Sequence, residues 1–138
     1  MSSKARKGKV RVRPLTLKEA FEAESVRREM EQRKRDEAER RQQEEDLARA
    51  EQLFEAIKAD PGFLHERELV VDLRRYTVSI DHRDYRVAAY FEAGKASVTS
   101  ADKRTASTST AAPRKQVTVD TVDEALAAMA QFLVDESR

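Results

Sequence analysis

The sequence predicts an α+β fold in which a long charged N-terminal helix precedes a small antiparallel β-β-β-β-α module. Three observations support this prediction. Residues 16–60 contain neither Gly nor Pro and consist mainly of strong helix formers. Beyond Pro61 the apolar residues alternate with polar ones, as they do in strands. The last apolar segment, residues 122–133, returns to a helical spacing.

The composition limits the size of the core. Apolar residues make up 39% of the chain and charged residues 38%, whereas globular chains average about 45–50% and about 25%. We therefore expect a small core in one part of the chain. Cysteine is absent, which excludes disulfides and Cys-ligated metals. No apolar run approaches the ~20 residues of a membrane span, and the N-terminus has no apolar signal region, so we expect a cytoplasmic protein without membrane contact.

Residues 1–15 are predicted to form a flexible basic arm, because they have too little apolar surface to offset the entropy of ordering. The first 18 residues hold seven basic side chains and no acidic one, while the rest of the chain holds 20 basic and 26 acidic ones. Spaced cations on a flexible backbone can follow a phosphate backbone. We expect binding to nucleic acid or a nucleoprotein; an acidic protein surface and a solubilising tail are the alternatives. The arm residues expected to bind are Lys4, Arg6, Lys7, Lys9, Arg11 and Arg13.

Residues 16–60 are predicted to form the charged helix. It begins with a capping box at Thr16–Glu19 and ends at Asp60–Gly62. Between Glu31 and Asp46 the only apolar residue is Ala38, so two successive heptads lack the apolar positions of a coiled coil. Opposite charges four residues apart stabilise this middle part as a solvent-exposed helix. The expected pairs are Glu29–Arg33, Glu31–Arg35, Asp36–Arg40 and Glu37–Arg41.

Both ends of this helix carry apolar residues. Near its end, Leu47, Leu53, Phe54 and Ile57 are expected to dock on the module, whose own core is marginally small. Near its start the apolar residues are expected to form a stripe that binds a partner through a helix-in-groove contact. A second copy packing there and a helix that bends back are the alternatives. The expected partner-binding residues are Leu17, Phe21, Val26 and Met30.

The module, residues 61–138, is predicted from two hairpins that bury the same face. A turn at His82-Arg83 sets Ile80 opposite Tyr85, Val78 opposite Val87, and Tyr76 opposite Ala89. A turn at Ala93-Gly94 sets Phe91 opposite Ala96 and Ala89 opposite Val98. Residues 116–120 are the expected fourth strand, and a capping box at Thr121–Glu124 starts the final helix. The Ser/Thr-rich residues 100–115 are expected to be a flexible loop.

The outer face of the predicted sheet is a second candidate for binding nucleic acid. Sheets that bind single strands place Arg beside exposed aromatic rings. Here Arg75 is expected opposite Tyr90, with Arg86 on the same face. An ordinary solvated sheet face is the simpler alternative, since only one aromatic residue is exposed on it.

Signals for catalysis are weak. The two histidines, His65 and His82, fall in a linker and at a hairpin tip, and they lack the close spacing of a zinc site. The three glycines are too scattered for a phosphate-binding loop. We therefore expect no enzyme, no cofactor, no metal and no small-molecule substrate.

The sequence thus favours a non-catalytic binding protein. Its basic arm is expected to engage a polyanion, nucleic acid or nucleoprotein, while the α+β module contacts protein or forms a homodimer. The alternative is a structural adaptor or oligomerising protein that acts through protein–protein contacts alone.

Overall fold

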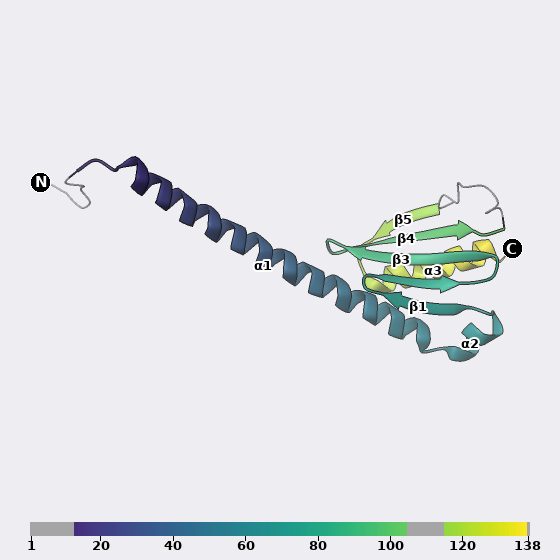
Figure 1. Ribbon diagram of the computed structural model, residues 1–138. Coiled ribbons are helices and arrows are strands. Elements are labelled where there is room, and N and C mark those ends of the chain that lie inside the picture. Colours follow the sequence, from purple (N-terminus) through teal and green to yellow (C-terminus); the bar gives the residue numbers. More distant parts are fainter. Residues whose placement is uncertain (1–12, 105–114, 138) are drawn as a thin grey trace, which may run out of the picture. The chain divides into compact units, whose positions relative to one another are not determined.

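The computed structural model describes residues 13–104 and 115–137 and confirms the α+β fold (Figure 1). A long helix is followed by a short helix, a five-stranded antiparallel sheet and a C-terminal helix. The chain divides into two compact units within the long helix, residues 1–38 and 39–138. The elements are α1 (Leu17–Lys58), α2 (Pro61–Glu66), β1 (Val70–Arg74), β2 (Thr77–Asp81), β3 (Tyr85–Glu92), β4 (Lys95–Asp102), β5 (Lys115–Val119) and α3 (Val122–Glu136).

The start of α1 has the predicted capping box. The backbone N–H of Glu19 donates to Thr16 Oγ1 at 3.2 Å, and the N–H of Thr16 donates to Glu19 Oε1 at 3.0 Å. All side chains of residues 25–41 are exposed, as expected for the charged middle of the helix. Ion pairs between side chains stabilise this part of the helix, but some of the partners differ from the predicted ones. Glu31 pairs with Arg27 at 2.6 Å instead of with Arg35.

Glu24 is an acid of this helix with a strongly lowered pKa. Hydrogen bonds from Arg27 and Arg28 lower its pKa from 4.5 to about 2. Because the folded pKa lies below the unfolded one, these contacts stabilise the helix above pH 4.5, and the contribution is lost as the pH falls from 4.5 to about 2. An NMR titration of the Glu24 carboxylate at low salt should give a midpoint near 2. The side chain is solvent-exposed, so molar salt should move the midpoint back towards 4.5; a midpoint near 4.5 at low salt would contradict the pairing.

The turn after α1 is also the start of α2, in a segment that was predicted to be a linker. Asp60 is the N-cap of α2, its Oδ1 accepting from the N–H of Phe63 at 3.2 Å, and Pro61 occupies the first helical position. Proline is favoured there because its missing N–H would have no helical partner. The breaker segment therefore ends one helix and begins another.

The sheet has five strands in chain order, β1-β2-β3-β4-β5, instead of the four predicted. The additional strand is β1, the β-prone run after Leu69, which pairs antiparallel with β2. A two-residue turn at Arg75-Tyr76 joins the two strands, with Arg75 at a φ of 54°. The alternation of this run is too weak to identify it as a strand from the sequence.

The register of the β2–β3 hairpin differs from the prediction by two residues. The N–H of His82 donates to the carbonyl of Tyr85 at 2.9 Å, so the turn residues are Arg83 and Asp84. Val78 consequently lies opposite Ala89, and Ile80 opposite Val87. A shift by two keeps every side chain on its predicted face. The β3–β4 register, with Phe91 opposite Ala96 and Ala89 opposite Val98, is confirmed.

The predicted flexible loop at 100–115 has different bounds. Strand β4 continues to Asp102, and β5 already begins at Lys115. Residues 105–114 lie outside the described residues. The capping box of α3 is confirmed, with Thr121 and Glu124 as its two members.

The core lies between one face of the sheet and the two long helices. Helix α3 runs along this face against β3 and β4 (Figure 1). The expected docking of the end of α1 is confirmed for Leu53 and Ile57, which are buried, while Leu47 is 36% exposed. The buried apolar residues are Ala50, Leu53, Ile57, Leu69, Val78, Ile80, Tyr85, Val87, Ala89, Phe91, Ala96, Val98, Ala125, Ala128, Met129 and Phe132.

A buried carboxylate on α1 holds the β3–β4 turn. Asp46 is only 4% exposed, and its oxygens accept from the backbone N–H groups of Ala93 and Gly94, each at 3.0 Å. Gln42 Nε2 donates to the same carboxylate at 3.1 Å, and Arg49 Nη1 donates to the carbonyl of Gly94 at 2.7 Å. Both turn residues have positive φ, 53° and 81°, as tight hairpin turns of this hand require. Helix α1 thus satisfies the polar backbone groups of a strained turn.

Candidate functional site

The predicted arm residues lie almost entirely upstream of the described part. Lys4, Arg6, Lys7, Lys9 and Arg11 lie outside the described residues. Arg13 is described, and its guanidinium makes two contacts with Glu19, Nη1–Oε1 at 2.9 Å and Nη2–Oε2 at 2.5 Å. The hydrogen bond to Glu19 raises the pKa of Arg13. The charge of Arg13 is therefore paired with Glu19 of the capping box. The basic residues before Arg13 are the stronger candidates for binding a polyanion.

The outer face of the sheet does not place Arg75 opposite Tyr90, as was predicted. Tyr90 is 41% exposed but lies opposite Thr77 and Ser97, so the expected pairing with Arg75 is wrong. The register shift of the β2–β3 hairpin leaves Arg75 in the turn before β2. Charges on the face are also mixed, since Arg86 Nη1 lies 3.8 Å from Asp81 Oδ1. The face is thus a weaker polyanion site than the sequence indicates.

The predicted partner-binding residues at the start of α1 are all solvent-exposed. Leu17, Phe21, Val26 and Met30 are 87%, 70%, 54% and 55% exposed. They do not form one stripe, because at 100° per residue the Leu17–Phe21 pair lies on the opposite side of the helix from the Val26–Met30 pair. The start of α1 therefore presents two separate apolar pairs.

The module contains a partly open apolar cavity that is not among the predicted sites. It has a volume of about 470 Å³ and lies between the end of α1, α2, the sheet and α3. We call it the helical cavity. Phe63, Leu126 and Val134 line it and are also partly exposed, which makes its opening apolar. The sequence signal was the second apolar column of α3, residues 126, 130 and 134, beside the column that covers the sheet. Volumes of about 300–1,000 Å³ with mostly apolar walls are typical of ligand sites.

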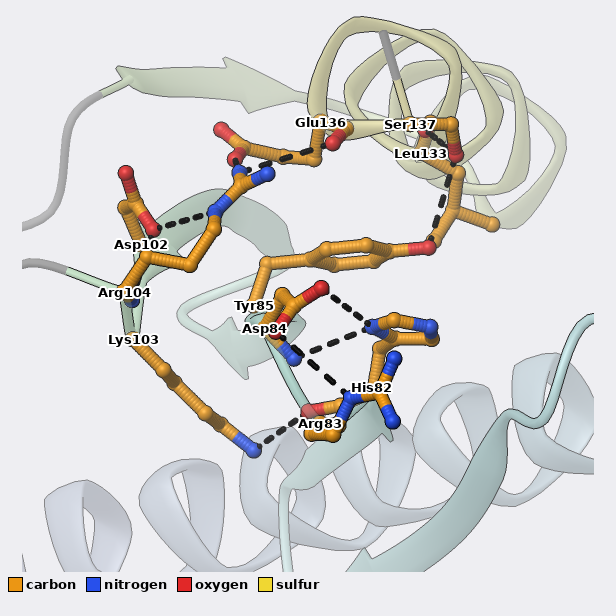
Figure 2. Close-up of polar contacts among 10 residues, drawn as sticks. All are labelled: His82, Arg83, Asp84, Tyr85, Asp102, Lys103, Arg104, Leu133, Glu136 and Ser137. Carbon is orange, nitrogen blue, oxygen red and sulfur yellow. Dashed lines mark hydrogen bonds and ion pairs between the residues drawn. The ribbon is translucent and has the colours of Figure 1, made fainter.

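Beside this cavity a polar cluster joins the β2–β3 turn and the end of β4 to the end of α3 (Figure 2). The rings of His82 and Tyr85 are stacked with centroids 4.5 Å apart, and Tyr85 Oη lies 3.4 Å from Ser137 Oγ. Arg104 contacts Asp102 at 2.9 Å and Glu136 at 3.0 Å.

The hydrogen bonds of this cluster explain its role. His82 Nδ1 accepts from the backbone N–H of Asp84 at 3.0 Å, and Ser137 Oγ donates to the carbonyl of Leu133 at 2.6 Å. The imidazole Nδ1 and the hydroxyl proton are thus engaged with backbone groups. His82, expected on a solvated hairpin tip, has a side chain only 16% exposed because Tyr85 covers it. The arrangement ties the β2–β3 turn to the end of α3.

Two further observations concern metal ions and membranes. In the described ranges, 13–104 and 115–137, no group of three or more His, Asp or Glu side chains is placed to hold a metal ion. None of the helices in the described part is both long and apolar enough to cross a membrane.

Comparison with known proteins finds no matching family model, no matching curated protein and no matching solved structure.

Proposed function

We propose that this chain is a non-catalytic binding protein whose basic N-terminal segment engages a polyanion, nucleic acid or nucleoprotein, in the cytoplasm. The observation that carries the proposal is the segregation of charge. Seven of the 27 basic residues lie within the first 18 positions, where there is no acidic residue. Such a segment neutralises phosphates and releases their counterions.

The charges of the described part support this assignment to the N-terminal segment. On α1 the arginines Arg27, Arg28 and Arg40 are paired with glutamates three or four residues away. On the sheet, Asp81 lies within 3.1 Å of Lys103 as well as near Arg86. Paired cations bind a polyanion weakly, because a phosphate must first displace the carboxylate. These paired cations are therefore weaker candidates than the basic residues before α1, among which no acidic residue lies.

The second candidate function is a structural adaptor that acts only through protein contacts. Two observations favour it: the exposed apolar pairs at the start of α1 and the apolar opening of the helical cavity. Exposed apolar groups of this kind mark surfaces that a partner covers. In this function the basic N-terminal segment binds no polyanion.

The test of the first function is a salt series with labelled duplex DNA and RNA. For duplex DNA each neutralised phosphate contributes about 0.9 to the slope of log affinity against log salt. Replacing Lys4, Arg6, Lys7, Lys9 and Arg11 with Gln should therefore reduce the slope by up to about 4 to 5 and weaken binding at physiological salt. The matched control is R75Q/R86Q on the module, for which we expect less than half of this change. Binding that keeps its slope after the five replacements, or is absent in the intact chain, would refute the polyanion function and favour the adaptor.

A further inference from the structure

The helical cavity has an apolar wall that extends along α3. Ile57, Leu64 and Met129 are among the aliphatic side chains that line it. Its lining residues on α3 extend from Leu126 to Ser137, and a rise of about 1.5 Å per residue makes this stretch about 16 Å long. Half of the hydrocarbon core of a bilayer is also about 15 Å thick. The cavity therefore matches, in length and in polarity, a single alkyl chain of the kind found in membrane lipids.

The polar residues of the cavity lie at one of its ends. Ser137 is the C-cap of α3, and its Oγ lies 3.4 Å from Tyr85 Oη beside the β2–β3 turn (Figure 2). Arg67 is the C-cap of α2 and is followed by β1, which begins opposite Asp81 beside the same turn. Leu126, by contrast, lies on the first turns of α3, towards the other end of this helix. The cavity thus suits an amphipathic ligand whose polar group lies near the end of α3.

Arg67 gives this polar end a cation that can bind an anion. The two charged residues of the cavity lining are Asp60 and Arg67. Asp60 Oδ1 caps α2 by accepting from the backbone N–H of Phe63 at 3.2 Å. Within residues 13–104 and 115–137, no hydrogen bond or ion pair engages the Arg67 guanidinium, whose carbon lies 6.0 Å from the centroid of the Phe63 ring. A carboxylate is the matching group, because it accepts two parallel hydrogen bonds from a guanidinium.

A second donor at this end is the hydroxyl of Tyr85. Tyr85 is only 4% exposed, and a buried tyrosine hydroxyl usually has a hydrogen-bond partner. Its partner in the described part of the chain is Ser137 Oγ at 3.4 Å, whereas hydroxyl hydrogen bonds are normally about 2.5–3.0 Å long. The Ser137 hydroxyl itself donates to the carbonyl of Leu133 at 2.6 Å. The Tyr85 O–H is therefore weakly bonded and can donate to a better acceptor, such as a ligand oxygen.

We propose that the helical cavity binds a single-chain fatty acid. The alkyl chain lies along α3 towards Leu126, and the carboxylate lies at the polar end, where Arg67 and the Tyr85 hydroxyl are the donors. The fatty acid is a bound ligand that is not converted, so the expectation of no small-molecule substrate is unchanged. The proposal goes beyond the proposed function and is independent of it, because polyanion binding is assigned to the N-terminal segment and the cavity lies in the module.

The test is isothermal titration calorimetry of the full chain with laurate below the concentration at which laurate forms micelles. We expect a single site per chain. Octanoate has four fewer methylenes and should bind up to about 200-fold more weakly, because each buried methylene contributes about fourfold to the affinity. Dodecyltrimethylammonium has an alkyl chain of the same length and the opposite charge. It should bind at least about tenfold more weakly than laurate, because a cation is repelled by Arg67.

One pair of variants tests whether the alkyl chain occupies the cavity. Ala130 lines the cavity and is exposed at its opening, so A130F should fill the opening with a ring and abolish laurate binding. The matched control is A127F, which adds the same ring at an exposed position of α3 outside the cavity lining and should bind laurate like the intact chain.

Two further pairs test the donors of the polar end. R67Q should weaken laurate binding about tenfold, because a charged hydrogen bond is lost. Its control is R74Q, which removes an exposed arginine of β1. Y85F should weaken laurate binding about fivefold through the loss of one neutral hydrogen bond. Its control is Y90F on the outer face of the sheet. Both controls should bind laurate like the intact chain.

The proposal is overturned if laurate does not bind up to about 1 mM, if A130F, R67Q or Y85F binds it as tightly as its control does, or if dodecyltrimethylammonium binds as tightly as laurate. The N-terminal variant tests whether laurate instead binds the basic segment. Laurate binding that is lost when Lys4, Arg6, Lys7, Lys9 and Arg11 are replaced with Gln would also overturn the proposal. R67Q should bind DNA or RNA with the salt slope of the intact chain, so the two proposals fail separately.

Discussion

Replacing Asp46 with Ala is expected to lower the free energy of unfolding by about 3 kcal/mol, because the change removes a buried carboxylate that accepts from two N–H groups of the β3–β4 turn. The turn is strained, with Ala93 at a φ of 53°. It therefore depends on the contact with Asp46 to keep this conformation. The measurement is urea unfolding followed by tyrosine fluorescence. All three tyrosines lie in the unit of residues 39–138.

The neighbouring acid provides the control for this prediction. Glu45 is exposed, and its replacement with Ala should change the stability by less than about 0.5 kcal/mol. D46N should lie between D46A and the intact chain, since its amide oxygen can still accept from one turn N–H whereas its amide nitrogen cannot accept from the other. A D46A variant as stable as E45A would mean that the carboxylate does not hold the turn.

Leu53→Ala is the second large effect, a loss of about 3 kcal/mol. Leu53 is fully buried in the core that α1 shares with the sheet and α3. Truncating such a side chain costs the transfer free energy of the lost methyl groups and leaves a cavity, typically about 2–5 kcal/mol in total. The same urea unfolding measures it.

Leu47→Ala is the matched control, because Leu47 stands on the same helix and is 36% exposed. Its truncation should cost about 1 kcal/mol or less. A loss for Leu53→Ala as small as that expected for Leu47→Ala would show that the end of α1 does not contribute to the core.

The fold was largely predictable because its periodic signals are strong. The helical composition before Pro61, the Thr121–Glu124 capping box and the Ala93-Gly94 turn each gave the correct element. The β2–β3 register was missed because it depends on a local contact, the N–H of Asp84 donating to the His82 side chain. Strand β1 was missed because only three of its five residues are apolar and its outer face is exposed.

The candidate sites were less predictable because they depend on three-dimensional proximity. Asp46 continues the apolar column of residues 50, 53 and 57 towards the N-terminus. A charged residue in such a column indicates a buried polar contact, but not its partner, which lies 47 positions away. The helical cavity likewise forms from four elements whose arrangement no local pattern encodes. The grouping of Leu17 with Met30 was an error of helical geometry that the period of 3.6 residues corrects.

The central claim is that α1 changes its role near Asp46: beyond this residue it is part of the core, and before it the helix stands in water on its own side-chain pairs. Residue-resolved amide hydrogen exchange along α1 tests this most directly. Amides of residues 50–57 should exchange only through global unfolding, while those of residues 25–38 should exchange many times faster, as in an isolated helix. Equal protection along the whole of α1 would contradict the account.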